Sequence, residues 1–297
     1  MYAIKTLTSK LFESLPSVHR ARKNSILFAV KALCRGGKLN LTNLGRSADA
    51  STSVKHSIKR IDRLISNPRV FSEIPLFCKA MASLIISPHS KPMILVDWTL
   101  LGKEHCALVA SVPFQGRAIT LYYEVHPLSR LANRQVEYGF LDKFRDLLPE
   151  GVVPTLVTDA GYLNPWFKKV IELGWRFVGR LTPRMRLYTA TGQWTSVRKL
   201  EDSAKANPAD YGVCSVTVVN PTNYRIIQNK HFKRNPKRKP ERRLYTSPGR
   251  GAKRSRKRAQ TPWVLGSNHE DLSAQEIIDI YGSCHLEITY INHIDTT

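Results

Sequence analysis

Two apolar stretches, Met93–Trp98 (MILVDW) and Val152–Asp159 (VVPTLVTD), decide the fold class of this chain. Each is a short, nearly continuous hydrophobic run of the kind found in strands that are buried on both faces. The first strand is predicted to end at Asp97 and the second at Asp159. A carboxylate at the end of a buried strand is partly desolvated, which is unfavourable unless a cation or a hydrogen-bond donor meets it.

The segments around these two runs alternate between strand and helix patterns. Further strands are predicted at Ala107–Val112, Ile119–Val125 and Trp175–Leu181, and helices at Ala132–Leu148 and Asn164–Leu173. A turn is predicted at Gln115 and Gly116, between the second and third strands. This order predicts an α/β domain in which a mixed sheet carries helices on its faces.

The two aspartates indicate a metal site. Two carboxylates on neighbouring strands would repel each other, and a divalent cation between them would relieve that repulsion. Oxygen ligands with open positions suit Mg²⁺, with Mn²⁺ as a substitute, and a pair of such ions can activate a hydroxyl for attack on a phosphodiester. Asp97 and Asp159 are therefore predicted to be catalytic metal ligands, and the alternative is a turn cap at each strand end.

The charge of the chain points to a polyanionic partner. The 297 residues include 46 Lys and Arg against 23 Asp and Glu, a net charge of +23. Residues 1–90 hold 15 basic and 4 acidic side chains, residues 230–258 hold 14 and 1, and the remainder is nearly neutral. Two basic segments that flank a neutral body favour nucleic acid as the partner.

Other features of the composition predict a cytoplasmic protein without a membrane partner. No apolar run approaches the roughly 18 residues of a membrane span, and the N-terminus has no secretory signal pattern. The five cysteines are scattered and never paired as Cys-x-x-Cys, which is typical of a reducing compartment.

Residues 1–90 are predicted to form a helical DNA-binding domain. Helices are expected at Arg20–Leu33, at Leu41–Ala48 with Thr42 as its cap, and after the Ser51–Ser53 cluster. The third helix has an apolar stripe and resembles the recognition helix of a helix-turn-helix arrangement. Its cations that are predicted to contact DNA are Lys55, Lys59, Arg60 and Arg63. A solvated amphipathic helix would show the same pattern, but the net charge favours DNA contact.

The second basic segment, residues 230–258, is interrupted by prolines and glycines. We therefore expect a loop or hairpin that contacts phosphates without reading bases, and a solvated charge run or an import signal is the alternative. The cations predicted to contact DNA are Lys237, Arg238, Lys239, Arg242, Arg243, Arg254, Arg256, Lys257 and Arg258.

Several short motifs follow one another over residues 1–283. They are LTNLGR, HSIKRIDRLISN, VDWT at Asp97, VTDAGY at Asp159, PWFKKV, LGWRFVGR, PWVLGSN and IIDIYGS. Together these motifs resemble the DDE transposases of the insertion-sequence-four family. The resemblance implies a ribonuclease-H-like catalytic fold with a preceding helical DNA-binding domain. It also implies bacterial cut-and-paste transposition with two Mg²⁺ ions, by a nucleoid-associated homodimer that holds transposon ends and target DNA in a synaptic complex.

The same resemblance implies a domain layout. The catalytic domain would begin with residues 91–182, continue after a β-rich insertion at 183–266 that holds the basic tract 230–258, and end within 267–297. Strands of the insertion are predicted at Val216–Val219, Arg225–Gln228 and Trp263–Leu265. Trp194 and Trp263 are candidates to support a displaced base at the cut end, and core packing is the alternative for both.

The family's third acid lies on the last helix, in the pattern Tyr, two residues, Arg, three residues, Glu, six residues, Lys. Tyr281 matches as a remnant of this motif, whereas Cys284, Ile288 and Asp295 occupy the other three positions. Glu287 is the candidate replacement, although one helical step turns a side chain by roughly 100°. Glu276 and Asp279 are weaker candidates on the same helix. The sequence after Ser283 loses its helical pattern, so we expect a truncated or frameshifted last helix with an aberrant tail.

The sequence thus predicts a DDE transposase that is impaired by the loss of its third acid. A second hypothesis is a non-catalytic, truncated product that binds transposon ends and interferes with full-length transposase. A third is a basic nucleic-acid-binding protein unrelated to transposition, which the two aspartates argue against. Motifs of serine hydrolases, P-loop proteins and dinucleotide-binding folds are absent from the sequence.

Overall fold

The protein divides into two units, which are considered separately. The computed structural model describes residues 2–48, 52–205, 207–230 and 262–291, and for residues 2–5 and 284–291 it describes the backbone alone. Unit 1 comprises Met1–Pro88 and Asp146–Glu150, and unit 2 comprises His89–Arg145 and Gly151–Thr297. Apart from Lys230, the loop or hairpin predicted at 230–258 lies outside the described residues.

The described part of unit 1 before Pro88 consists of helices joined by short loops. The helices of this part are α1 (Tyr2–Glu13), α2 (Arg20–Cys34), α3 (Leu41–Ser47), α4 (Val54–Ile65) and α5 (Pro68–Ile85). The three predicted helices correspond to α2, α3 and α4, whereas α1 and α5 were not predicted. Ala32, Leu44 and Ile61 form a buried cluster where α2, α3 and α4 meet. This cluster explains why the apolar stripe of α4 is buried at its centre and exposed at its ends.

The predicted cap of α3 is wrong by two positions. Asn40 is the N-cap, and its Oδ1 accepts a hydrogen bond from the backbone N–H of Asn43 at 2.8 Å. Because the helix starts at Leu41, Thr42 already lies inside the first turn, where its side chain cannot cap that end.

Gly45 permits the close crossing of α3 and α4. A Cβ atom at this position would lie 2.3 Å from Ile58 Cγ1 and 2.8 Å from Ile58 Cα. We expect Gly45→Ala to lower the free energy of unfolding of unit 1 by roughly 1–2 kcal/mol, because the steric strain exceeds the ~1 kcal/mol gain in helix propensity. Urea denaturation followed by circular dichroism measures the change.

Gly139→Ala is the matched control, since Gly139 also lies in a helix but has no atom within 4 Å of the added Cβ. This variant should be neutral or more stable by up to ~1 kcal/mol. Equal stability of the Gly45→Ala variant and the unmodified chain would contradict the close crossing.

Unit 2 is built on one mixed sheet. Its described strands are β1 (Met93–Leu101), β2 (His105–Phe114), β3 (Arg117–Pro127), β4 (Thr155–Thr158), β5 (Arg176–Arg180), β6 (Arg186–Tyr188), β7 (Trp194–Ser196), β8 (Ala209–Val216), β9 (Thr222–Asn229) and β10 (Trp263–Ser267). Their order is β3-β2-β1-β4-β5-β10-β9-β8-β6-β7. Strands β1, β4 and β5 are parallel, and the other neighbours are antiparallel. The predicted α/β class with a mixed sheet is confirmed.

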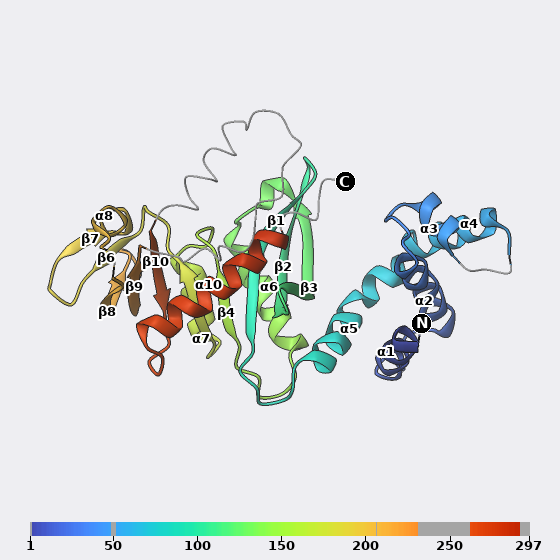
Figure 1. Cartoon of the computed structure of the whole chain (residues 1–297), viewed down its shortest axis with the longest axis horizontal. Helices are drawn as coiled ribbons and strands as arrows, with labels where there is room; N and C mark the ends of the chain where they lie inside the picture. The colour runs from blue at the N-terminus through green and yellow to red at the C-terminus, as the bar shows by residue number, and fades with distance from the viewer. Residues whose placement is uncertain (1, 49–51, 206, 231–261, 292–297) are drawn as a thin grey trace. The chain divides into compact units, whose positions relative to one another are not determined.

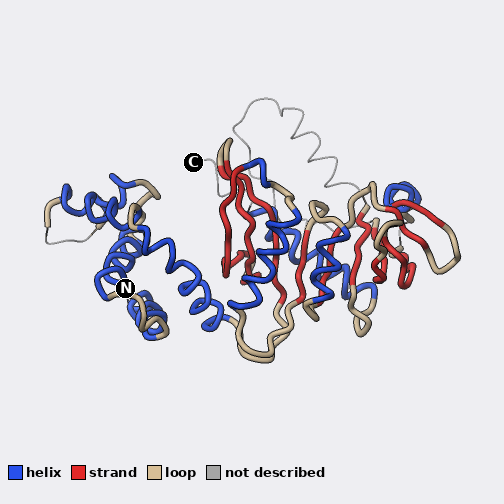
Figure 2. Tube along the Cα trace, turned by 180° about the vertical axis from the view of Figure 1, so that it is seen from behind, coloured by secondary structure: helices blue, strands red, loops and turns tan. Residues whose placement is uncertain are grey.

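Helices cover both faces of this sheet. The helical segments are η1 (Leu128–Arg130), α6 (Arg134–Leu147), α7 (Asn164–Glu172), α8 (Val197–Ser203) and α10 (Ala274–Ile291). Helix α10 crosses one face, whereas α6 and α7 lie on the opposite face, as the two opposed views show (Figures 1 and 2). The predicted turn at Gln115 and Gly116 joins β2 to β3, and both residues have positive φ angles of 48° and 77°, which is typical of a tight hairpin.

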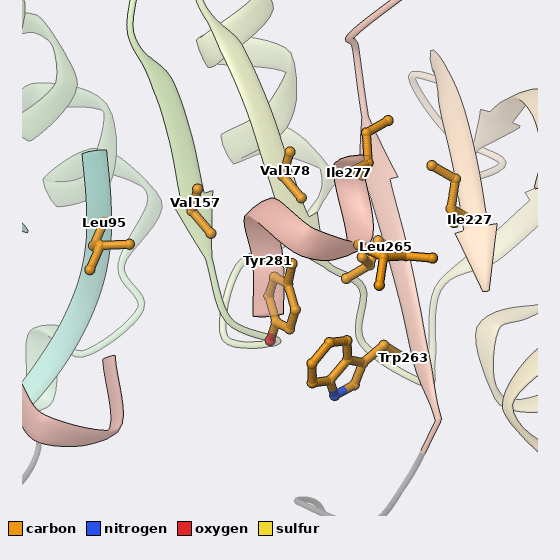
Figure 3. Packing of buried hydrophobic residues seen from close by; sticks show 9 residues of the cluster. Leu95, Val157, Val178, Ile227, Trp263, Leu265, Ile277 and Tyr281 are labelled. Carbon is orange, nitrogen blue, oxygen red and sulfur yellow. The ribbon is translucent and has the colours of Figure 1, made fainter. Parts of the chain in front are cut away.

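Each face of the sheet has its own core. Under α10, residues of five strands pack against Ile277, Ile278 and Tyr281 (Figure 3). Under α6 the core is aromatic, and the ring of Tyr122 packs against Phe140 and Phe144 with centroids 5.0 and 6.3 Å apart. The alternation of side chains along each strand therefore decides which helix a residue meets.

Several predicted boundaries are wrong, and the strand predicted from Val152 begins only at Thr155. Asp97 does not end β1, because pairing with the long strand β2 continues to Leu101. Only Val216 of the predicted strand Val216–Val219 lies in a strand, since the chain turns at Thr217, whose φ is 70°. The helical pattern that the sequence loses after Ser283 does not end the helix, because the backbone of α10 continues to Ile291. Extension of an existing helix adds one hydrogen bond per residue and tolerates weak helix formers.

Candidate functional site

The structure brings Asp97 and Asp159 to adjacent positions on neighbouring strands. The parallel pairing of β1 with β4 ends at Val96 and Thr158, so the two aspartates are the next residue on each chain segment. Paired strands lie about 4.8 Å apart. Both side chains are half-buried. The pair therefore has the closeness and partial access to solvent that a metal-binding site needs.

Side-chain alternation directs both carboxylates toward α10. Leu95 and Val157, two residues before each aspartate, pack under this helix, and alternate residues of a strand share a face. The hydroxyl of Tyr281 on α10 donates a hydrogen bond of 3.0 Å to Asp159 Oδ1. Tyr281 is thus more than a remnant of a sequence motif, because it links the last helix to the second aspartate.

A buried arginine completes this side of the site. Arg180 on β5 is 4% exposed and forms a side-chain hydrogen bond with Tyr281. Burial, followed by the charge of Asp159, raises the pKa of Tyr281 well above its usual value, and the positive charge of Arg180 opposes this shift. Tyr281 therefore stays protonated and remains a hydrogen-bond donor to Asp159.

Tyr162 lies among three carboxylates. Its side chain is 1% exposed, and its hydroxyl has no hydrogen-bond partner within the described part of the chain. Burial raises the pKa of Tyr162 well above its usual value, and the charges of Asp97, Glu137 and Asp159 raise it further. Burial thus leaves the Tyr162 hydroxyl as a protonated donor with no acceptor among the described residues.

Glu137 is a buried acid behind the first strand. It lies on α6 with 6% exposure, and its Oε1 accepts a hydrogen bond of 3.2 Å from Trp98 Nε1. Burial raises the pKa of the Glu137 carboxyl to about 7, although the Trp98 bond and the charge of Arg134 act in the opposite direction. Glu137 is therefore anchored to the residue that follows Asp97.

Sequence reasoning missed Glu137, Tyr162 and Arg180. A signal existed for Glu137, because it shares a helical stripe with Phe140 and Phe144, where an acid is unusual. Tyr162 and Arg180 lie inside the motifs VTDAGY and LGWRFVGR, but their spacing alone gives no reason to place them near the aspartates.

The two aspartates supply a pair of carboxylates to which a divalent ion could bind. Across the described ranges, which exclude the side chains after Ser283, no group of three or more His, Cys, Asp or Glu residues could hold a metal ion. Mg²⁺ in proteins commonly keeps several waters and binds through one or two carboxylates together with substrate phosphates. Asp97 and Asp159 supply two such carboxylates.

The position expected for the third acid holds an isoleucine. Ile288 follows Tyr281 by seven residues on α10, and residues two turns apart share one face of a helix. Glu287, the candidate replacement, is the residue before Ile288 in the backbone of the same helix. The side chains of Glu287 and Ile288 lie outside the described residues.

The two weaker candidates have other roles or positions. Glu276 forms a capping box at the start of α10, in which its Oε2 accepts hydrogen bonds of 2.7 Å from the backbone N–H and the hydroxyl of Ser273. Asp279 is exposed and accepts a hydrogen bond of 2.9 Å from Gln275. Glu276 therefore stabilises the helix terminus.

The predicted DNA contacts on α4 are exposed. Lys55, Lys59 and Arg63 lie on its surface. Arg60 is also exposed, but its guanidinium lies 4.3 Å from the ring centre of Phe28. The same group donates a hydrogen bond of 3.0 Å to the carbonyl of Asn24. Arg60 thus helps to hold α4 against α2. The predicted contacts from Lys237 to Arg258 lie outside the described residues.

The two candidate tryptophans differ in their surroundings. Trp263 is 5% exposed and packs edge-on against Tyr281 with ring centroids 4.7 Å apart, so it belongs to the core. Trp194 is 41% exposed, lies beside Tyr188 and carries the guanidinium of Arg186 over its ring. The core-packing alternative thus describes Trp263 and not Trp194.

Comparison of the sequence with profiles of known protein families gave no match, and comparison with curated proteins gave no significant match either. Of the helices that the structure describes, none is both long and apolar enough to cross a membrane.

Proposed function

We propose that this chain is a DNA transposase of the DDE type that binds transposon ends. The observation that carries the proposal is the register of β1 and β4, which makes Asp97 and Asp159 neighbours on parallel strands. The contact between Tyr281 and Asp159 supports it further, because it brings the helix on which the family's third acid would lie against the second aspartate.

The arrangement of the elements also supports a ribonuclease-H-like domain. Three antiparallel strands followed by two parallel ones, in the order β3-β2-β1-β4-β5, agree with that fold. The exposed cations of α4 support a DNA-binding role for the helical unit 1. The strands β6 to β10 extend the same sheet and correspond to the proposed β-rich insertion.

Asp97 and Asp159 would hold Mg²⁺, with Mn²⁺ as a substitute, through their carboxylate oxygens. When bound, two such ions activate a hydroxyl nucleophile and stabilise the leaving oxygen of a phosphodiester. The protonated Tyr281 orients the Asp159 carboxylate through its hydrogen bond. Buried Arg180 and Tyr281 exclude water from that side of the site. The cations of α4 would hold the DNA backbone.

A second candidate function is end binding without cleavage. It is favoured by one observation, namely that Ile288 occupies the position expected for the third acid. A chain of this kind would occupy transposon ends, alone or in a homodimer, and would interfere with full-length transposase. Salt-sensitive binding of end DNA with no cleavage in Mg²⁺ or Mn²⁺ would select this function.

Metal binding tests the role of the two aspartates. We expect Asp97→Asn and Asp159→Asn each to weaken Mn²⁺ binding at least about 10-fold, because each removes an ionised ligand. Electron paramagnetic resonance of free Mn²⁺ measures the affinity. Asp279→Asn is the matched control on exposed α10 surface and should bind as the unmodified chain does. Unchanged Mn²⁺ affinity in both aspartate variants would refute the metal site.

A further inference from the structure

Unit 1 contains a basic cavity away from α4. The cavity has a volume of about 660 Å³ and lies where the turn before α2 meets the first turn of α5. Its lining includes His19, Arg20, Arg22, Lys23 and Arg69, and none of the residues that line it is acidic. We propose that this cavity binds a phosphate group of the DNA backbone, as a contact separate from α4. The proposal rests on the proposed function only in taking DNA as the source of the phosphate.

Two of these cations are held in place by other parts of unit 1. Arg22 donates two hydrogen bonds to the carboxylate of Glu73 on α5, at 2.8 and 2.5 Å. Lys23 Nζ donates a hydrogen bond of 2.9 Å to the carbonyl of Phe12 at the end of α1. The Arg22–Glu73 pair fixes the first turn of α2 to the second turn of α5, so the walls of the cavity are pre-organised.

The side chains of Arg20 and Arg69 are available to bind a ligand. Both side chains are exposed, and neither has an ion-pair partner in the described part of unit 1. They come from α2 and α5, and so they approach the cavity from two different elements. Planar guanidinium groups can bind phosphate oxygens with two parallel hydrogen bonds each.

The helix termini at the cavity strengthen the preference for an anion. Helix α2 starts with Arg20, Arg22 and Lys23 in its first turn, and neither α2 nor α5 has an acid there. The N-terminus of a helix carries partial positive charge, so cations at this end destabilise the helix and anions stabilise it. Among the ion pairs of the described residues, Arg22 is the cation of this group that a carboxylate offsets, that of Glu73. A bound phosphate would relieve the repulsion between these cations and the positive N-terminal end of α2.

The form of the cavity favours a phosphate within a polymer. It is open to solvent on one side, and it is larger than a single phosphate group needs. None of its lining residues belongs to α4. DNA bound by unit 1 would therefore meet two groups of cations, the exposed face of α4 and this cavity.

The salt dependence of DNA binding tests the proposal. We expect Arg20→Gln/Arg69→Gln in the full chain to bind a 30-base-pair duplex roughly 10-fold more weakly in 150 mM KCl without divalent metal. The slope of log affinity against log salt should fall by about 1 to 2, because fewer phosphates are neutralised. Fluorescence anisotropy over a KCl series measures both quantities, and a thermal melt checks that the variant is folded.

Lys10→Gln/Lys79→Gln is the matched control, because it removes the same charge from exposed positions of α1 and α5 outside the cavity. It should change affinity by less than about 2-fold, with little change in slope. If the two double variants bind the duplex with equal affinity and equal salt slope, the proposed phosphate contact is wrong. The proposed function would still stand in that case, provided that the unmodified chain binds DNA.

Inorganic phosphate distinguishes the source of the anion. Isothermal titration with phosphate should show binding to the unmodified chain and a loss of binding in Arg20→Gln/Arg69→Gln. The Arg20→Gln/Arg69→Gln variant could lose phosphate binding and still bind DNA as well as the Lys10→Gln/Lys79→Gln control does. That result would assign the cavity to a free anion and would overturn the DNA contact. Failure of the unmodified chain to bind any duplex would refute the proposed function and this contact together.

Discussion

Ile288→Glu is expected to give metal-dependent cleavage of transposon-end DNA at a rate roughly 10²-fold or more above that of the unmodified chain. The reason is the position of Ile288 in the motif of the last helix. Ile288 lies two helical turns beyond Tyr281 on α10, and Tyr281 contacts Asp159. An acid at this position, which the family motif assigns to the third acid, would add a third carboxylate to Asp97 and Asp159, and developing charge at a phosphodiester is stabilised by the metal ions that such carboxylates hold. Nicking of a labelled duplex in Mg²⁺ or Mn²⁺ measures the rate.

Three further variants make this result specific. Ile288→Gln keeps a side chain of similar size without the charge and should remain inactive. Ile288→Glu/Asp97→Asn should lose the new activity, because it removes a metal ligand. Glu287→Gln tests the candidate replacement, and its cleavage rate should equal that of the unmodified chain. Cleavage by the unmodified chain that is abolished in Glu287→Gln would show that Glu287 supplies the third acid.

Glu137→Gln is expected to remove a loss of about 3 kcal/mol in the unfolding free energy of unit 2 that the unmodified chain undergoes as the pH rises from 4 to 8. Burial raises the pKa of Glu137 to about 7, whereas an unfolded glutamate titrates near 4.3. The folded state therefore favours the protonated form. The stabilisation that the protonated Glu137 carboxyl contributes is fully present below about pH 4. It is lost as the pH rises toward 7, because the buried carboxyl must then ionise.

The glutamine variant retains an oxygen that can accept the hydrogen bond from Trp98 but cannot ionise. Relative to the unmodified chain, Glu137→Gln should gain about 3 kcal/mol of unfolding free energy between pH 4 and pH 8. Urea denaturation at several pH values measures this difference. A difference between the two proteins that does not vary with pH would contradict the buried, ionising carboxyl.

Glu124 provides a matched control of opposite sign. Burial alone would raise the pKa of Glu124, but hydrogen bonds from Tyr122, Lys143 and His126 hold the pKa below its usual value. Its stabilisation is therefore present above about pH 4.5 and is lost as the pH falls. Glu124→Gln should be less stable than the unmodified chain at neutral pH, and that deficit should shrink in acid.

Much of unit 2 was predictable because its strands are local patterns. The apolar run MILV identifies β1, and the turn at Gln115 and Gly116 marks the hairpin that follows. Boundaries were less predictable, since the length of β1 depends on pairing with β2 rather than on its own residues. The short strands β6 and β7 were missed, because three-residue segments contain too little periodicity to recognise.

The sequence by itself determined the apolar runs that lead to Asp97 and Asp159, the basic segments, and the absence of an acid at Ile288. Only the tertiary structure decided that Tyr281 meets Asp159 across 122 residues, that Glu137 reaches Trp98, and that α2 and α5 enclose a basic cavity. The physical reason is that periodicity is encoded within one element. Contacts between distant residues depend instead on strand register and on how the faces of all the elements pack together.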